Sequence, residues 1–293
     1  MKLSEKQFTD TPRGRFHVRT TAGDGFPVVM LHGWPESSYC WTPIAERLDG
    51  AFRVIAPDLR GLGDSVRTAD RDDYRKQALA EDVLAVLDAM GVEQFHLVGH
   101  DWGGAVAQEV ALAAPQRVQR LCLMNIVVIN NLRGTREALE KACSRGNFHA
   151  WYQHFQQSPN LAEAMIPGNE EAWLSYFLRN WSGEPFPADA LAEYVRYYRL
   201  PGTPAAGASY YRAMRDDSKR WATLAGRKFP MPSLYIYGNK DPVIIPEYLN
   251  HLEDAFENVR VEQIEAGHFV QEEQPDAVAR HLNAFLKQPR AGA

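Results

Sequence analysis

FHLVGHDWGGAVAQEVALAAP, residues 95–115, is the stretch that decides the predicted fold of this 293-residue chain. Its apolar first part has the pattern of a buried strand up to His100, and its second part has the pattern of a helix that Pro115 ends. Glycines stand on both sides of Asp101, and glycine permits a tight turn between a strand and a helix. The stretch therefore predicts a sharp elbow that exposes the Asp101 side chain at the carboxyl end of a sheet, where α/β proteins bind ligands.

Strand-like and helical segments alternate on both sides of this elbow. Apolar, β-branched runs predict further strands at residues 28–33, 53–58, 118–128, 233–241 and 259–265. Apolar residues at helical spacing predict helices at residues 76–90, 248–256 and 275–286. Buried strands that alternate with helices form parallel sheets covered on both faces. We therefore expect an α/β fold with a mostly parallel central sheet.

The middle of the chain, from about residue 130 to residue 225, has a different composition. Trp, Tyr, Phe and Arg are frequent there, Pro and Gly interrupt the pattern, and strand-like runs are few. This segment predicts a helical cap, or lid, inserted between two strands of the core. The expected domains are a core of residues 1–128 and 226–293 and a cap of residues 129–225.

The bulk composition indicates a globular protein without a nucleic-acid or membrane partner. Apolar residues make up 45% and charged residues 24% of the chain, and the net charge is −5. There is no basic run of the kind that binds nucleic acids, no apolar run long enough to span a membrane, and no signal-peptide pattern at the N-terminus. The widely spaced Cys40, Cys122 and Cys143 give no disulfide framework, so we expect a cytoplasmic location.

An aspartate at the tip of the elbow, where serine is usual, changes the expected chemistry. Its carboxyl group, with an ordinary pKa of about 3.9, is already ionised at neutral pH. A carboxylate is suited to attack a saturated carbon, which leaves an alkyl ester on Asp101. Water must then hydrolyse the ester, and a histidine with an ordinary pKa of about 6.5 is a suitable general base for that step.

The segments after the predicted cap supply the partners for this reaction. His268 follows the last predicted strand, and Asp241 follows the strand before it. The chain order of nucleophile, acid and histidine is that expected for a catalytic triad that follows a strand-to-helix elbow. Asp241 would hold the imidazole of His268 in the required tautomer. The expected oxyanion donors are the backbone N–H groups of Trp102, directly after the nucleophile, and of Trp34, in a turn fixed by the following proline.

Five motifs in this order together resemble the α/β-hydrolases that attack with an aspartate. These are the epoxide hydrolases, the haloalkane dehalogenases and the haloacetate (fluoroacetate) dehalogenases. The motifs are HGWPESSYCW (32–41), APDLRGLGDS (56–65), GHDWGG (99–104), GNKDPVI (238–244) and AGHFVQEEQP (266–275). The resemblance implies the α/β-hydrolase fold. The acid position after the strand at 233–241 makes the epoxide hydrolases the most similar branch.

Epoxide hydrolases generally present two cap tyrosines to the oxygen of the epoxide ring. The segment SYYRAMRDDSKRW (209–221) resembles the one that carries the second tyrosine, here Tyr211. The position of the first tyrosine holds Trp151, and Tyr152 stands next to it, about 100° further round a helix. The resemblance therefore implies Tyr211 as the acid for the leaving oxygen, and leaves open whether Trp151 or Tyr152 faces the substrate.

Other features resemble the dehalogenases. Trp102 follows the nucleophile as in haloalkane dehalogenases, where an indole N–H can bind the leaving halide. Trp151 resembles the tryptophan of the fluoride pocket in fluoroacetate dehalogenases, but Ala150 stands where that branch has histidine. The arginines with which that branch grips a carboxylate are absent after Asp101. Some dehalogenases place their acid after the preceding strand, where this chain has Asn125.

These observations predict a hydrolase that acts through an ester on Asp101. Hydrolysis of epoxides to vicinal diols is the preferred reaction, and haloalkane or haloacetate dehalogenation is the alternative. A small-molecule receptor or binding protein that kept the pocket but lost turnover is the alternative from another class. The expected partner is a small epoxide or organohalide. Neither a dinucleotide fingerprint nor a metal-ligand spacing indicates a cofactor or metal, and a homodimer stays open.

Overall fold

The central sheet consists of the predicted strands and a hairpin that precedes them. The computed structural model describes residues 2–4, 7–144 and 150–288. Its strands form one sheet in the order β1-β2-β4-β3-β5-β6-β7-β8. They are β1 (Gln7–Thr11), β2 (Gly14–Thr20), β3 (Phe26–Leu31), β4 (Phe52–Pro57), β5 (Phe95–His100), β6 (Val118–Met124), β7 (Ser233–Gly238) and β8 (Val259–Ile264). Neighbouring strands from β4 to β8 are parallel, so the predicted α/β class with a mostly parallel sheet is confirmed.

Three segments differ from the sequence predictions. The antiparallel hairpin of β1 and β2 was not predicted, because its strands at the sheet edge are short and largely polar. β6 ends at Met124 rather than at residue 128, since the next residue, Asn125, has a φ of 41°. The predicted helix at 248–256 consists instead of two short 3₁₀ turns, η4 (Pro246–Leu249) and η5 (Leu252–Asp254). His251 between them has a φ of 62°, which interrupts a right-handed helix.

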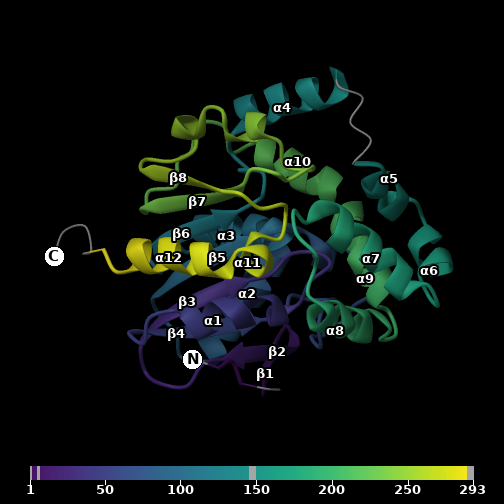
Figure 1. The fold of residues 1–293 in the computed structure, drawn as a ribbon, viewed down its shortest axis with the longest axis horizontal. Helices are drawn as coiled ribbons and strands as arrows, with labels where there is room; N and C mark the ends of the chain where they lie inside the picture. Colours follow the sequence, from purple (N-terminus) through teal and green to yellow (C-terminus); the bar gives the residue numbers. More distant parts are fainter. Residues whose placement is uncertain (1, 5–6, 145–149, 289–293) are drawn as a thin grey trace.

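Helices cover both faces of the sheet (Figure 1). α1 (Thr42–Arg47), α11 (Val270–Glu273) and α12 (Pro275–Leu286) pack together on one face. α2 (Lys76–Ala89) and α3 (Asp101–Ala113) pack against each other on the opposite face. The central strand β5 is buried along its whole length. This burial on both faces explains its continuous apolar sequence.

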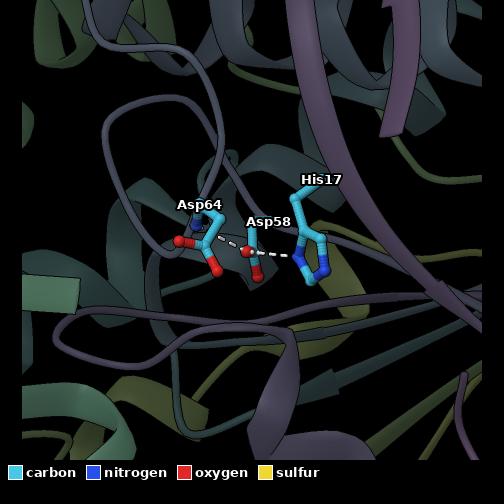
Figure 2. A group of neighbouring side chains, drawn as sticks. All are labelled: His17, Asp58 and Asp64. Atoms are coloured by element: carbon cyan, nitrogen blue, oxygen red, sulfur yellow. Dashed lines mark hydrogen bonds and ion pairs between the residues drawn. The ribbon is translucent and has the colours of Figure 1, made fainter. Parts of the chain in front are cut away.

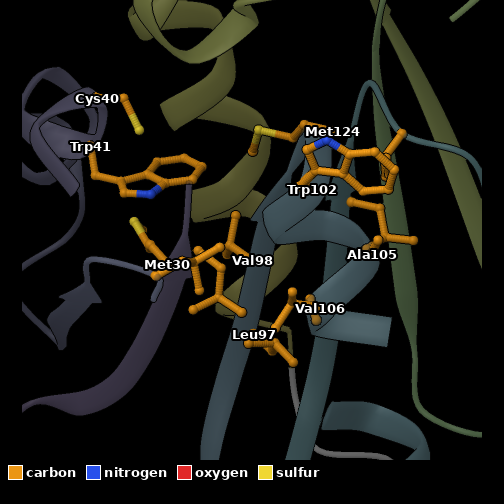
Figure 3. Packing of buried hydrophobic residues seen from close by; sticks show 14 of the residues in the cluster. Met30, Cys40, Trp41, Leu97, Val98, Trp102, Ala105, Val106 and Met124 are labelled. Atoms are coloured by element: carbon orange, nitrogen blue, oxygen red, sulfur yellow. The ribbon is translucent and has the colours of Figure 1, made fainter. Parts of the chain in front are cut away.

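The core between these layers is filled by side chains that alternate across the sheet. Figure 3 shows Leu97 of β5 beside Val106 of α3, while the neighbouring Val98 lies on the side of Met30 and Trp41. Successive residues of a strand point to opposite faces, so one apolar run supplies both halves of the core. All five side chains are completely buried.

The parallel strands bring distant parts of the chain together at their carboxyl ends. Leu31 pairs with Gly99, and His100 pairs with Met124, so β3, β5 and β6 end side by side. β7 and β8 end next in order, with Gly238 paired with Ile264. The residues that follow these strands therefore lie at one edge of the sheet, where the sequence analysis expected the site.

Seven helices lie between β6 and β7 in the described sequence, beyond this edge of the sheet (Figure 1). They are α4 (Leu132–Ser144), α5 (Trp151–Gln157), α6 (Leu161–Met165), α7 (Glu170–Trp181), α8 (Ala188–Tyr198), α9 (Thr203–Arg212) and α10 (Met214–Ala222). We propose that they form the cap, with the predicted limits of 129 and 225. None of the helices in the described residues is long and apolar enough to cross a membrane.

Candidate active site

The turn between β5 and α3 has the geometry predicted for the elbow. Asp101 has a φ of 48°, a strained value for a residue that carries a side chain. A Cβ added to Gly103 would lie 2.3 Å from the carbonyl oxygen of His32, and one added to Gly33 would lie 2.4 Å from the Cβ of Asp101. The two glycines therefore permit the close approach of the elbow and the loop after β3, which points the Asp101 carboxylate toward that loop.

Both predicted oxyanion donors reach the Asp101 side chain. The backbone N–H of Trp34 donates to Oδ1 of Asp101 over 2.8 Å, and the backbone N–H of Trp102 contributes to the lowered pKa of this carboxylate. The turn that presents the Trp34 donor contains a cis peptide bond between Trp34 and Pro35. Two N–H groups from separate loops thus converge on one carboxyl group, as an oxyanion hole requires.

His268 lies between the two predicted carboxylates. Its Nδ1 is 2.7 Å from Oδ2 of Asp241, and its Nε2 is 3.5 Å from Oδ2 of Asp101. Burial of the imidazole lowers the pKa of His268, but the charges and hydrogen bonds of Asp241 and Asp101 outweigh this effect and raise the pKa to about 10. Burial raises the pKa of Asp101, but His268 and then His100 outweigh it and the net shift is downward. The arrangement therefore holds an imidazolium between two carboxylates at neutral pH.

Asn125 holds the Asp241 carboxylate in place, a role that the sequence analysis missed. Its side-chain N–H donates to Oδ2 of Asp241 over 2.6 Å, and its side-chain oxygen Oδ1 accepts from the backbone N–H of Gly238 over 2.9 Å. Oδ1 of Asp241 accepts from the N–H groups of Val243 and Ile244. The position of Asn125 directly after β6 was the available signal, because the residue after a parallel strand lies at the site edge.

A second buried polar group supports the backbone of His268 and was also missed. His100 Nε2 lies 2.8 Å from the carbonyl oxygen of His268, and its Nδ1 lies 2.8 Å from Oε2 of Glu36. Burial lowers the pKa of His100 to about 4 and raises the pKa of Glu36 to about 7. A neutral His100 that donates from Nε2 must accept at Nδ1, and a protonated Glu36 carboxyl can supply that proton. This hydrogen-bonded pair supports the backbone of the loop that carries His268.

The structure distinguishes between Tyr152 and Trp151, which the sequence left open. Tyr152 is 4% exposed and stacks on Trp34 with 5.8 Å between ring centroids, whereas Trp151 is 40% exposed. The buried face of α5 is formed by Tyr152 and Gln156, four residues apart. Trp151 packs instead against Trp173 and other aromatic side chains on the outer side of the cap. The proposed placement of Trp151 at the substrate is therefore corrected, because helix rotation turns it outward.

Tyr211 lies beside Tyr152 and the elbow. Its ring centroid is 5.4 Å from that of Tyr152 and 5.4 Å from that of Trp102. Burial, followed by the effects of Tyr152 and the Asp101 carboxylate, raises the pKa of Tyr211 well above its ordinary value. Burial likewise raises the pKa of Tyr152. Both phenols are therefore neutral; Tyr152 lines the cavity at Asp101, whereas Tyr211 is not among its described lining residues and lies behind Tyr152 and Trp102.

A mostly apolar cavity of about 320 Å³ opens from Asp101 toward α4 and α10. Trp102, Ile126 and Tyr152 are buried parts of its wall, and the exposed side chains of Leu132 and Leu139 also line it. Among the described residues that line this cavity, Asp101 is the only charged one. The cavity therefore suits an uncharged apolar molecule and offers no counter-ion for an anionic one.

One group of side chains has the spacing of metal ligands in the described part of the chain, namely His17, Asp58 and Asp64 (Figure 2). Nδ1 of His17 lies 2.7 Å from Asp58, which also accepts from the backbone N–H groups of Ser38 and Asp64. The carboxylate of Asp64 accepts two hydrogen bonds from Arg196. These oxygens already have partners, so the group fits the role of anchoring the loop after β4. None of the three residues lines the cavity at Asp101.

Comparison with known proteins identifies the family of this chain. Residues 27–275 match the family model described as alpha/beta hydrolase fold. The chain is 34% identical over 272 residues to a soluble epoxide hydrolase of Corynebacterium sp. (strain C12), which covers 90% of this chain and 91% of that protein. It is 29% identical over 278 residues to a fluoroacetate dehalogenase of Burkholderia sp., with 92% and 90% covered.

A solved structure gives the same result. Cfl2 from Burkholderia cenocepacia superposes with a TM-score of 0.85 at 31% identity, over 96% of this chain and 95% of that chain. The chain therefore belongs to the α/β-hydrolase family, in the group that includes epoxide hydrolases and dehalogenases, and it is a hydrolase.

Proposed function

We propose that this hydrolase opens epoxides and releases vicinal diols, through an alkyl ester on Asp101. The observation that carries the proposal is the position of the Asp101 carboxylate, with two backbone donors on one side, two neutral phenols nearby and an uncharged apolar cavity in front. The similarity to the soluble epoxide hydrolase of Corynebacterium sp. (strain C12) supports the same reaction.

In the first step, a carboxylate oxygen of Asp101 attacks a ring carbon of the epoxide. The new carbon–oxygen bond forms as the ring bond breaks, and the electron pair of that bond goes to the ring oxygen. Tyr152 and Tyr211 donate hydrogen bonds to this oxygen and supply its proton. A phenol with a raised pKa remains protonated until such a strong base develops beside it.

In the second step, water attacks the carbonyl carbon of the Asp101 ester. His268 accepts the proton of this water, with its other nitrogen held by Asp241. The N–H groups of Trp34 and Trp102 stabilise the oxyanion that develops on the former carboxylate. Collapse of this intermediate breaks the bond between the Asp101 carbonyl carbon and the substrate oxygen, which takes the proton from His268 and leaves as the diol. The Asp101 carboxyl group keeps one solvent oxygen and gives its proton back to His268, and the tyrosinate formed in the first step takes a proton from solvent.

Ester formation would itself prepare His268 for this second step. In the free protein, Asp241 and Asp101 together keep the pKa of His268 at about 10, so the imidazole is protonated. Esterification removes the charge of Asp101, which lies 3.5 Å from Nε2. The pKa of His268 then falls, the ring releases its proton to solvent, and a neutral base faces the ester.

Dehalogenation is retained as the second candidate function. The indole of Trp102 borders the cavity and would serve a departing halide, and the similarity to a fluoroacetate dehalogenase of Burkholderia sp. favours it. A small haloacid anion would, however, meet no cationic side chain among the described lining residues. An apolar haloalkane is therefore the preferred substrate within this alternative. A cytoplasmic location and a homodimer remain predictions, whereas membership of the hydrolase family argues against the receptor without turnover.

The test compares two substrates and traps the intermediate. Wild type is assayed with styrene oxide for diol release and with a bromoalkane for halide release. His268→Gln is mixed with the substrate that wild type turns over, and intact mass spectrometry should find one adduct on the Asp101 peptide. Single turnover of wild type in ¹⁸O water should give a first product molecule whose new oxygen comes from the protein.

Asp101→Asn is the matched control, because it keeps the shape of the side chain but forms no ester. Halide release without diol would reverse the order of the two candidate functions. If the first product molecule carries a solvent oxygen and His268→Gln stays unmodified, the ester mechanism is wrong for both candidates. Binding of both substrates without any turnover would contradict both candidate functions.

A further inference from the structure

Lys76, the first residue of α2, is completely buried. A lysine is rarely found without solvent contact, because its ammonium loses hydration. A positive charge at the N-terminus of a helix also opposes the helix dipole. Apolar side chains often replace buried ion pairs without loss of stability, so stability alone does not explain a lysine at this position.

The ammonium group of Lys76 has three partners from three helices. Nζ lies 3.0 Å from Oδ2 of Asp217 in α10, and it donates to the backbone carbonyl oxygen of Tyr210 in α9. It also lies over the indole of Trp102 in α3, 3.8 Å from the ring centroid, a cation–π contact. Oδ1 of Asp217 accepts from the backbone N–H of Lys76 over 3.0 Å, which caps α2 from outside its own sequence. One side chain thus joins the core to two helices of the proposed cap.

Each of these partners is the sequence neighbour of a residue of the site. Trp102 follows Asp101, and its own indole borders the cavity and the ring of Tyr211. Tyr210 precedes Tyr211, and Asp217 precedes Ser218, which also lines the cavity. A shift of the ammonium would therefore move the nucleophile turn, a phenol and the cavity wall together.

Resting on the proposed function, we propose that Lys76 is a positioning residue for the reaction. It holds the Trp102 indole and ties α9 and α10 to the nucleophile elbow, so that Tyr211 and the oxyanion donor of Trp102 face Asp101 in one fixed arrangement. Lys76 does not line the cavity itself, so it acts through these neighbours.

A second link between core and cap provides a contrast. Glu109 of α3 accepts hydrogen bonds from Arg220 and from the indole of Trp221 in α10. This link attaches the same helix α10, but among the described residues the ring of Trp102 contacts Lys76 and Tyr211 rather than Glu109. Asp216, next to Asp217, pairs at the surface with Arg71 and Lys219. The chain therefore contains a neighbouring carboxylate whose loss should leave the elbow unchanged.

The experiment uses two neutral replacements in the full chain. Lys76→Met keeps the length of the side chain and removes its charge, and the double variant Lys76→Met, Asp217→Leu leaves no unpaired buried charge behind. Asp216→Asn is the matched control. The readouts are kcat and KM on the substrate that wild type turns over, thermal unfolding, and the ¹⁹F NMR signal of Trp102 in 5-fluorotryptophan-labelled protein, assigned with Trp102→Phe.

We expect the double variant to fold with nearly the wild-type unfolding temperature and to lose about 10-fold to 100-fold in kcat, with a smaller change in KM. Substrate binding depends mainly on the apolar cavity, whereas the rate depends on the geometry at Asp101. The Trp102 fluorine signal should shift in both Lys76 variants and stay in place in Asp216→Asn.

Wild-type kcat in a folded double variant would overturn the proposal. Failure of the double variant to fold would assign Lys76 a purely structural role and overturn it as well. If wild type turns over neither epoxide nor haloalkane, the proposed function fails. In that case, a Trp102 fluorine signal that does not move in either Lys76 variant would show, without any activity measurement, that Lys76 does not position the elbow.

Discussion

The elbow of the core and helix α5 of the proposed cap both contribute to the candidate site, but their side chains are positioned by different means. At the elbow, backbone contacts determine where the side chain points, because Asp101 is held at a φ of 48° between closely approaching glycines. In α5, a regular helix, rotation about the axis decides whether Tyr152 or Trp151 faces inward. A side-chain position that the backbone determines can therefore be predicted from local sequence, whereas the choice of which helix face is buried depends on the packing partners.

The electrostatics of the two regions differ in the same way. In the core, Asp241 and Asp101 raise the pKa of His268 to about 10, so the groups there are charged at neutral pH. In the cap, burial raises the pKa values of Tyr152 and Tyr211, so these phenols are neutral. Charge thus resides on the nucleophile side, and uncharged donors face it.

The largest effect is expected when one methyl group is added at the elbow, because this tests directly whether backbone contacts determine the position of Asp101. Gly33→Ala would bring a Cβ to 2.4 Å from the Cβ of Asp101, so the loop that carries the Trp34 N–H must move away. We expect kcat to fall by about 100-fold with the fold retained, because a shift of about 1 Å is enough for such a loss. Steady-state kinetics and circular dichroism measure the two effects.

Gly50→Ala is the control for this experiment, since an added Cβ there meets nothing within 4 Å. A Gly33→Ala protein with wild-type kcat would show that backbone contact at the elbow does not control the position of Asp101.

A smaller effect should separate the two aromatic neighbours of α5. Tyr152→Phe removes a buried hydroxyl near Asp101, and we expect a loss of about 10-fold in the rate of epoxide opening, because Tyr211 remains as a second donor. Trp151→Phe alters only the outer face of the cap and should leave the rate nearly unchanged. Pre-steady-state measurement of ester formation compares the two variants directly. The reverse order of sensitivity would mean that α5 presents its other face to the substrate.

The smallest expected effect concerns the pH dependence of stability, which reports the charge of His268. The pKa of His268 is raised from 6.5 to about 10 on folding, so its stabilising contribution is fully present below pH 6.5 and is lost as the pH rises toward 10. Asp101→Asn removes one of the two carboxylates and lowers the pKa of His268 in the folded protein. Over this pH range, wild type should lose a few degrees more in unfolding temperature than Asp101→Asn does.

Asp276→Asn replaces an exposed carboxylate and serves as the control, so its unfolding temperature should change with pH as that of wild type does. Equal pH dependence of Asp101→Asn and wild type would indicate that Asp101 does not influence the charge of His268. Direct NMR titration of the imidazole would provide the same answer without unfolding.

Much of the core could be predicted from local patterns. The helix at 275–286 has the predicted limits, and β5 and α3 join at the predicted turn, because strong periodicity and glycine requirements act over a few residues. The structure brings Asp101, Asp241 and His268 together as their places after successive strands suggested. The prediction of a helix at 248–256 was wrong, because apolar periodicity does not reveal that one residue, His251, has a left-handed backbone conformation.

The sequence by itself determined the fold class, the elbow and the identity of the three groups Asp101, Asp241 and His268, since each depends on residue type and on position relative to a strand end. Only the tertiary structure decided that Tyr152 rather than Trp151 faces the cavity, that Asn125 holds Asp241, and that the Lys76 ammonium lies over the Trp102 indole. These contacts join residues far apart in the chain, and their geometry depends on how helices pack around a shared cavity. Local sequence does not encode such packing, because the same helical pattern fits more than one rotation.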